Sequence, residues 1–348
     1  MGTRMRRRFI ALALLQAGLL AGAPLAAAAE PLPQVTQLAT EAWRDAEPCG
    51  DRVYWAADHG WGSLDLGRQT ADVIDPDAQV RDLACLDPLR GRVIVTQTIP
   101  GNDYLLHYDP LPGAWAGVAL GSFYKVYVAP PRDGLFNLVL LSRDPLAHND
   151  RPQLLLPDTS GALTDTAVLQ ADLGRHDEVD LFGGWIWRDR LLFALYDELF
   201  ALDLRNPDAG FTAIAKPAAL SHVDGMTAAG ETALIVRGWA GPVLQFHRCA
   251  VLGDSLADCA LLHRWPGERP SATARFVASA DWVYRVAAGC GEAAGAVRQL
   301  VRLSVRDAGC EVVSAADRIL ALLPATGDGA ERLIVSDGER PYLVVLPP

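Results

Sequence analysis

The chain has 348 residues, of which 31 are lysine or arginine and 42 are aspartate or glutamate, so its formal net charge at pH 7 is −11. This acidity speaks against nucleic acids and anionic membrane surfaces as partners, because both are bound through clustered cations. Half of the residues are hydrophobic, which is enough for a large buried core.

The first 29 residues have the layout of a secretory signal peptide. A basic stretch with four arginines precedes an apolar segment over residues 9–25, and small residues follow it. The apolar segment is shorter than the roughly 20 residues that a membrane-spanning helix needs. We therefore expect cleavage after residue 28 or 29, and a mature domain over 30–348 that lacks a membrane span and is periplasmic or secreted. The arginine run leaves the general and the twin-arginine export routes both open.

Beyond the leader, short apolar runs alternate with Gly, Pro and Asp every eight to twelve residues, as in all-β domains. One element recurs, a turn residue followed by an apolar strand. It occurs at intervals of 40 to 55 residues, over 51–57, 91–97, 134–141, 189–196, 231–238, 281–287 and 331–337. A period of about 40–50 residues is typical of β-propellers, whose blades have four strands each.

On these seven elements the chain resembles secreted seven-bladed β-propellers as an architectural class, although no repeat motif names a family. A sandwich or a two-domain barrel would not contain seven copies, but the longest interval leaves six or eight blades open. The last blade has three strands, and a spare strand lies at 34–39. We expect this strand to pair with 340–346 and to close the ring, which leaves no sheet edge open.

Six cysteines in an exported chain favour disulfides over a metal site. The expected pairs are Cys49–Cys85, Cys249–Cys259 and Cys290–Cys310. The first pair joins inner strands of neighbouring blades, and the second crosses one hairpin. The third pair conflicts with the predicted strands, because its members lie at opposite ends of a third strand. Either the glycine-rich loop after Cys290 folds back, or the predicted register of the sixth blade is wrong.

In a propeller, the loops into the inner strands and the turns between second and third strands lie on one face, which we call the upper face. The candidate binding residues are assigned to this face: His176, Asp177, Asp180, His222, Asp224, His59, Trp61 and Trp239. In one interpretation, histidines of the fourth and fifth blades converge on a ligand and a neighbouring aspartate orients an imidazole. In the other, the same side chains cap turns and satisfy backbone groups.

No hydrolase, phosphate-loop or metalloprotease motif is present in the sequence. We therefore expect a non-catalytic propeller that binds a small ligand or a protein partner on its upper face. One alternative is a lyase or hydrolase with His176 or His222 as its base. Its cofactor is unknown, although the carboxylates of 75–82 and 176–180 could hold a divalent cation. The other alternative is a platform subunit of a periplasmic redox complex, whose cofactor the partner would carry.

Overall fold

The computed structural model describes residues 33–347 with gaps, the longest of which are 144–149, 156–167, 171–184, 267–274 and 291–297. By its internal contacts the chain divides into Met1–Leu32 and Pro33–Pro348, and the fold below is that of the second unit. Its described residues form seven four-stranded antiparallel sheets.

The strands of the first four sheets follow the order of the chain. Sheet one contains β2 (Trp43–Cys49), β3 (Arg52–Ala57), β4 (Trp61–Asp65) and β5 (Thr70–Asp75). Sheet two contains β6 (Gln79–Asp87), β7 (Arg92–Ile99), β8 (Asn102–Asp109) and β9 (Ala114–Ala119). Sheet three contains β10 (Phe123–Arg132), β11 (Leu135–Arg143), β12 (Asp150–Leu155) and β13 (Val168–Gln170). Sheet four contains β14 (Trp185–Trp187), β15 (Arg190–Leu195), β16 (Glu198–Asp203) and β17 (Phe211–Ile214).

Sheets five and six also follow the order of the chain, whereas sheet seven includes one strand from the beginning of the chain. Sheet five contains β18 (His222–Ala229), β19 (Ala233–Ala240), β20 (Val243–Leu252) and β21 (Ser255–Pro266). Sheet six contains β22 (Phe276–Ala278), β23 (Trp282–Ala287), β24 (Gln299–Ser304) and β25 (Cys310–Ala315). Sheet seven contains β26 (Arg318–Leu323), β27 (Glu331–Ser336), β28 (Pro341–Leu346) and, as its outer strand, β1 (Gln34–Gln37).

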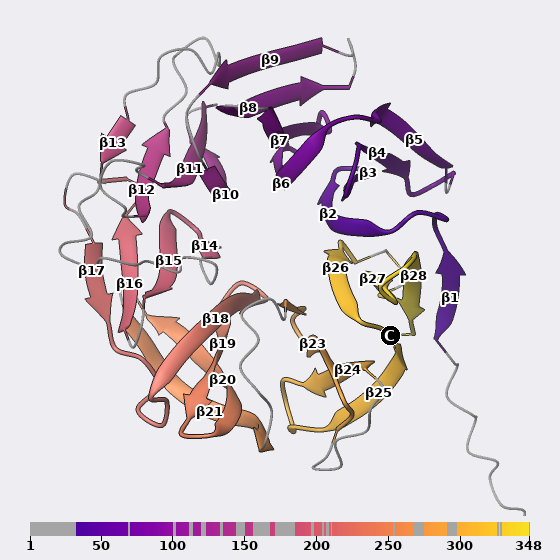
Figure 1. Ribbon diagram of the computed structural model, residues 1–348. Helices are drawn as coiled ribbons and strands as arrows, with labels where there is room; N and C mark the ends of the chain where they lie inside the picture. Colours follow the sequence, from indigo (N-terminus) through magenta and orange to yellow (C-terminus); the bar gives the residue numbers. More distant parts are fainter. Residues whose placement is uncertain are drawn as a thin grey trace, which may run out of the picture. The chain divides into compact units, whose positions relative to one another are not determined.

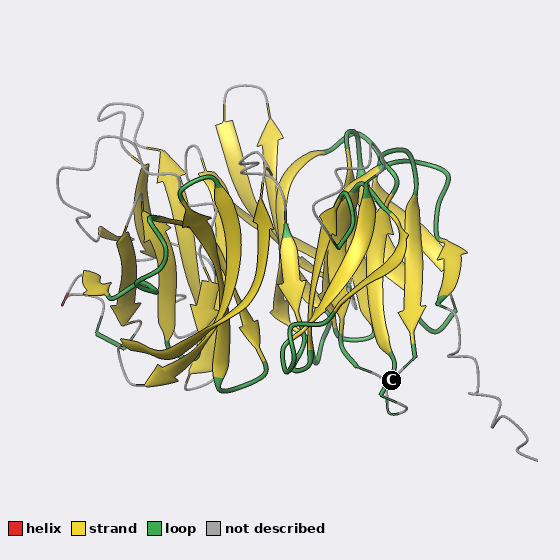
Figure 2. Ribbon diagram, turned by 90° about the horizontal axis from the view of Figure 1, so that it is seen from below, coloured by secondary structure: helices red, strands yellow, loops and turns green. Residues whose placement is uncertain are grey.

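The first strand of each sheet is its inner strand, and consecutive inner strands contact each other. These contacts run from β2 through β6, β10, β14, β18 and β22 to β26, and β26 in turn contacts β2. The order can be followed by colour in Figure 1, and Figure 2 shows the turns gathered at the two ends of the strands. The arrangement is that of an all-β propeller, the architectural class that the sequence resembles.

The outer strand β1 runs antiparallel to β28, with Gln34 opposite Val345 and Gln37 opposite Tyr342. Beyond the strand, the Leu38 amide donates to the Pro341 carbonyl at 3.0 Å. Leu38 also packs against the core between sheets one and seven. The segment is therefore held both by backbone hydrogen bonds and by apolar contact.

The core lies between neighbouring sheets, so the second strand of a sheet is covered on both faces. In β19 every residue but the last is buried, and in β3 every residue but the first. A strand covered on both faces can be apolar throughout, which explains why these strands form the recurrent element of the sequence. Between sheets one and seven, Trp43 and Trp55 stack with their ring centroids 5.3 Å apart.

Two tyrosines reinforce the packing near the end of the sheets at which the second strands begin. Tyr54 and Tyr284 each occupy the third position of a second strand and reach into the next sheet. The hydroxyl of Tyr54 donates to the Gly91 carbonyl at 2.6 Å, and that of Tyr284 donates to the Glu331 carboxylate. Burial raises the pKa of Tyr54 to about 12, so this hydroxyl remains a donor throughout the physiological range.

The disulfides are the three expected pairs: Cys49–Cys85, Cys249–Cys259 and Cys290–Cys310, with Cα atoms 5.2, 4.0 and 5.6 Å apart. The second pair lies within strands β20 and β21, because the hairpin extends further than the sequence predicted. At the third pair the chain folds back after β23. The Trp265 indole donates to the Gly289 carbonyl at 3.3 Å, and Cys290 packs on the core between sheets five and six. The expected third pair is therefore present, and the glycine-rich residues 291–297 lie outside the described residues.

Candidate binding site at the starts of the inner strands

The upper face is the end of the sheets at which the inner strands begin. In sheet one, Trp43 at the start of β2 lies opposite Ala57, the last residue of β3, beside the turn at 58–60. In sheet five, His222 at the start of β18 lies opposite Trp239 near the end of β19. The start of an inner strand and the turn between the second and third strands therefore share one end of these sheets.

Three of the predicted site residues, His176, Asp177 and Asp180, lie outside the described residues. The expected convergence of the fourth and fifth blades on a ligand therefore stays a prediction. The remaining candidates belong to sheets one and five.

Asp224 is held by two buried side chains of the neighbouring strand. Its carboxylate accepts a hydrogen bond from Arg237 Nε at 2.7 Å and another from Trp239 Nε1 at 3.1 Å. The pairing of β18 with β19 shifts register between Val223 and Gly225, and such a bulge re-aims a side chain. Asp224 thus fastens the start of β18 to β19, and its two bonded partners are not histidines.

His222 opens β18 and is half-buried. Its neighbour Ser221 is fixed to the end of β19, since both its amide and its hydroxyl donate to the Trp239 carbonyl, at 2.7 and 2.8 Å. Lys216 Nζ donates to the Ser221 carbonyl at 2.7 Å. His222 is therefore presented from a segment with a fixed backbone.

Trp61 and Trp239 are buried, at 0% and 7% exposure. The sequence placed both in turns on the upper face, and this placement is wrong. Trp239 lies inside β19, and Trp61 is the first residue of β4 and packs between sheets one and two. Both strands extend further toward the upper face than expected, so the indoles belong to the core.

His59 is exposed in the turn between β3 and β4. The residue after His59 fixes the turn, because the Gly60 amide donates a hydrogen bond to the Ala78 carbonyl at 2.8 Å. Gly60 has a φ of +84°, and a Cβ there would lie 3.0 Å from Asp75 O and from atoms of Pro76. Only glycine suits both this conformation and this close approach.

Three further side chains, which the sequence analysis missed, lie at the same end of sheets six, seven and one. We call Arg275, Arg318 and Arg44 the entrance arginines. Each stands at or directly beside the start of an inner strand and donates to a carbonyl of the next one. Arg275 Nη1 bonds Leu320 O, Arg318 Nη1 bonds Arg44 O at 3.3 Å, and Arg44 Nη2 bonds Val80 O.

These bonds link the starts of β22, β26, β2 and β6 in series. Arg275 also contacts the inner strand after the next one, because its Nη1 lies 3.0 Å from Asp45 Oδ1 on β2. In the sequence, the signal is the recurrence of arginine where β22, β26 and β2 begin. Attention to histidine and aspartate as the usual chemical groups left this recurrence unnoticed.

Sheet five adjoins this series through Arg237. Its guanidinium carbon lies 4.9 Å from the ring centroid of Phe276, the first residue of β22 and the neighbour of Arg275. The polar groups of sheet five and the entrance arginines therefore follow one another along neighbouring inner strands.

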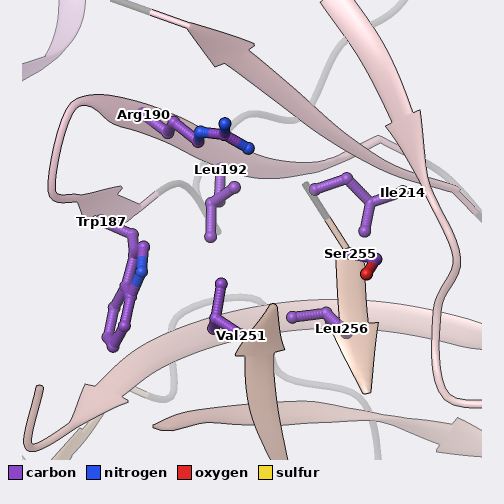
Figure 3. Close-up of a pocket in the computed structure, with 7 residues that line it drawn as sticks. All are labelled: Trp187, Arg190, Leu192, Ile214, Val251, Ser255 and Leu256. Carbon is purple, nitrogen blue, oxygen red and sulfur yellow. The ribbon is translucent and has the colours of Figure 1, made fainter. Parts of the chain in front are cut away.

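A small pocket lies at the opposite end of sheets four and five (Figure 3). It is open to solvent on one side, and Leu192 and Val251 face each other across it. Of its polar lining residues, Ser255 donates its hydroxyl to the Leu252 carbonyl at 3.0 Å. The pocket is bounded by the turns after β14 and β20, so it is not part of the candidate site.

Among the residues that the structure describes, no three His, Cys, Asp or Glu side chains are grouped so that they could hold a metal ion. In the same part of the chain, we find no helix with the length and apolar character needed to cross a bilayer.

No protein-family model matches the sequence, and no curated protein sequence matches it. The fold is similar to solved structures. A chain of the mitotic checkpoint complex superposes with a TM-score of 0.58 at 13% identity, covering 98% of this chain and 99% of that one. The AfRom2 CNH domain gives 0.55 at 9% identity over 90% and 99%. The Dos1 propeller gives 0.54 at 9% identity over 91% and 95%. At such identities the similarity supports the β-propeller fold alone.

Proposed function

We propose that the protein is an exported, non-catalytic β-propeller that binds a small ligand or a protein partner on its upper face. One observation carries this proposal: polar side chains gather where the inner strands of sheets five, six, seven and one begin. His59, Arg44 and Arg318 are exposed there, and His222 is half-buried. Inner strands run side by side, so groups at their starts can reach one ligand together.

We further propose that the seven sheets are the seven blades of one closed ring, with β1 as the outer strand of the last blade. The cycle of contacts among the inner strands supports this closure, and so does the register of β1 with β28. A closed ring fixes the positions of the inner-strand starts, which a binding site built from several blades requires.

Export and removal of residues 1–29 belong to the same proposal. The leader layout supports it. Three disulfides among the described residues also support it, since such bonds persist in oxidising compartments.

Binding is favoured over catalysis by the contacts of Asp224. An enzyme with His222 as its base would use an adjacent carboxylate to orient the imidazole. The carboxylate of Asp224 instead accepts hydrogen bonds from Arg237 and Trp239, which stabilises the sheet.

The test is a thermal-shift screen of the mature chain against sugars, amino acids, organic acids and nucleotides, with any hit verified by calorimetry. The variant His222→Ala with Arg318→Gln removes two groups of the upper face. The matched control is Arg306→Gln, an exposed arginine at the other end of sheet six that pairs with Asp281. We expect a hit that the upper-face variant loses and the control keeps. A hit that both variants bind like the unchanged protein would contradict the proposal.

A further inference from the structure

We propose that the upper face binds a ligand through an anionic group, a carboxylate or a phosphate, held by Arg44, Arg275 and Arg318. This inference rests on the proposed function and specifies the chemistry of the ligand. It concerns three neighbouring arginines on a chain whose formal net charge is −11.

The three arginines stand at or beside the starts of consecutive inner strands, and their hydrogen bonds connect these strands. Arg318 reaches the backbone of Arg44 itself, and Arg275 reaches both β26 and Asp45 of β2. The starts of β22, β26 and β2 are therefore adjacent at this face. Side chains that leave from adjacent strand starts can converge on one group.

Each guanidinium keeps the capacity to bind more than its present partner. A guanidinium carries five N–H groups in a planar fork that matches carboxylate and phosphate oxygens. The hydrogen bonds to the carbonyls of the next strand use one terminal nitrogen of each arginine. The side chains of Arg44 and Arg275 are 45% and 42% exposed, so solvent and solutes reach them.

Within the part of the chain that the structure describes, the carboxylates paired with the entrance arginines compensate only part of their positive charge. Asp45 pairs with Arg275 at 3.0 Å, whereas Asp58 lies 3.9 Å from Arg44 and is itself 80% exposed, so that pair is weak. Arg318 bonds a backbone carbonyl, which carries no net charge. The carboxylate of its neighbour Asp317 lies beside Gly338 in the turn between β27 and β28.

The carbonyl bonds also hold the arginines in place before a ligand arrives. An arginine that is free in solvent loses side-chain entropy when it binds, and a partly fixed one loses less. The same bond that joins one blade to the next therefore prepares the guanidinium for an anion.

The experiment is isothermal titration calorimetry of the mature chain at low ionic strength, with inorganic phosphate and citrate as separate probes. We expect saturable binding of at least one probe. Phosphate alone would identify a phosphate ligand, and citrate alone a carboxylate ligand. Arg318→Gln should weaken the binding by about 10- to 100-fold, as expected for the loss of one charge-assisted contact. Arg306→Gln, at the other end of sheet six, should leave it unchanged.

A second variant, Arg275→Lys, keeps the charge but removes the fork, and it should also weaken binding. Its folding is checked by its melting temperature. Binding of neither probe, or equal losses in R318Q and R306Q, would overturn the inference. An uncharged ligand that binds the upper face equally well in the unchanged protein and in R318Q would also overturn it, while leaving the proposed function intact.

Discussion

Replacement of Asp224 by alanine tests whether this carboxylate is structural. In the folded protein it accepts bonds from Arg237 Nε at 2.7 Å and Trp239 Nε1 at 3.1 Å. The Arg237 side chain is only 7% exposed and the Asp224 side chain 15%. Removal of Asp224 takes from this buried guanidinium the carboxylate that it bonds through Nε.

The expected loss in the free energy of unfolding is about 3 kcal/mol, the lower end of the range for a broken buried pair, because Asp224 keeps some contact with water. Replacement of both partners should restore much of the stability, since no uncompensated charge then remains. We therefore expect Asp224→Ala to be strongly destabilised, and Asp224→Ala with Arg237→Met to be less so.

The assay is equilibrium denaturation in urea, with His222→Ala as the control. This histidine is half-buried at the start of the strand, and its removal should cost less than about 1 kcal/mol. If Asp224→Ala unfolded at the same urea concentration as the unchanged protein but lost ligand binding, Asp224 would be a binding residue. The reasoning from its two bonds would then be refuted.

Three other predictions concern the fold. Deletion of residues 34–38 should lower the melting temperature and promote association, because it exposes the edge of β28; an unchanged melting curve would show that the edge is protected in another way. Replacement of Cys249 and Cys259 by serine should cost about 2–3 kcal/mol in chemical denaturation, and no loss would mean that the crosslink contributes nothing to stability. Burial raises the pKa of Glu331, so its contribution to stability is present at low pH and is lost as the pH rises through that raised value. Glu331→Gln stays neutral and should become increasingly more stable than the unchanged protein as the pH rises above the ordinary glutamate pKa, whereas parallel stability curves would contradict this.

The sequence predicted those parts of the fold that depend on local pattern. The second strands are apolar almost throughout because both of their faces are covered. Their positions could therefore be found from the apolar runs in the sequence. The assignment of four strands to each repeat then brought Cys49 close to Cys85 and Cys249 close to Cys259. The conflict at Cys290 arose because the path of a loop leaves no periodic signal in the sequence.

The residues of the candidate site were harder to predict from the sequence than the strands. Trp61 was placed in a turn because a strand boundary cannot be located to within one or two residues from sequence. The role of Asp224 depends on a bulge, and the roles of the entrance arginines depend on carbonyls of a neighbouring sheet. Both are tertiary features. The recurrence of arginine at the strand starts was visible in the sequence, but its meaning required the order of the inner strands in space.

The upper face is tested most directly by hydrogen–deuterium exchange of the mature chain with and without a bound ligand from the screen. The account predicts that the ligand slows exchange at the starts of the inner strands, in residues 43–45, 222–224 and 318–320. The turns at the other end of the sheets, such as the turn between β24 and β25, should exchange at unchanged rates. Protection confined to those turns, or to the outer strands, would contradict binding at the upper face.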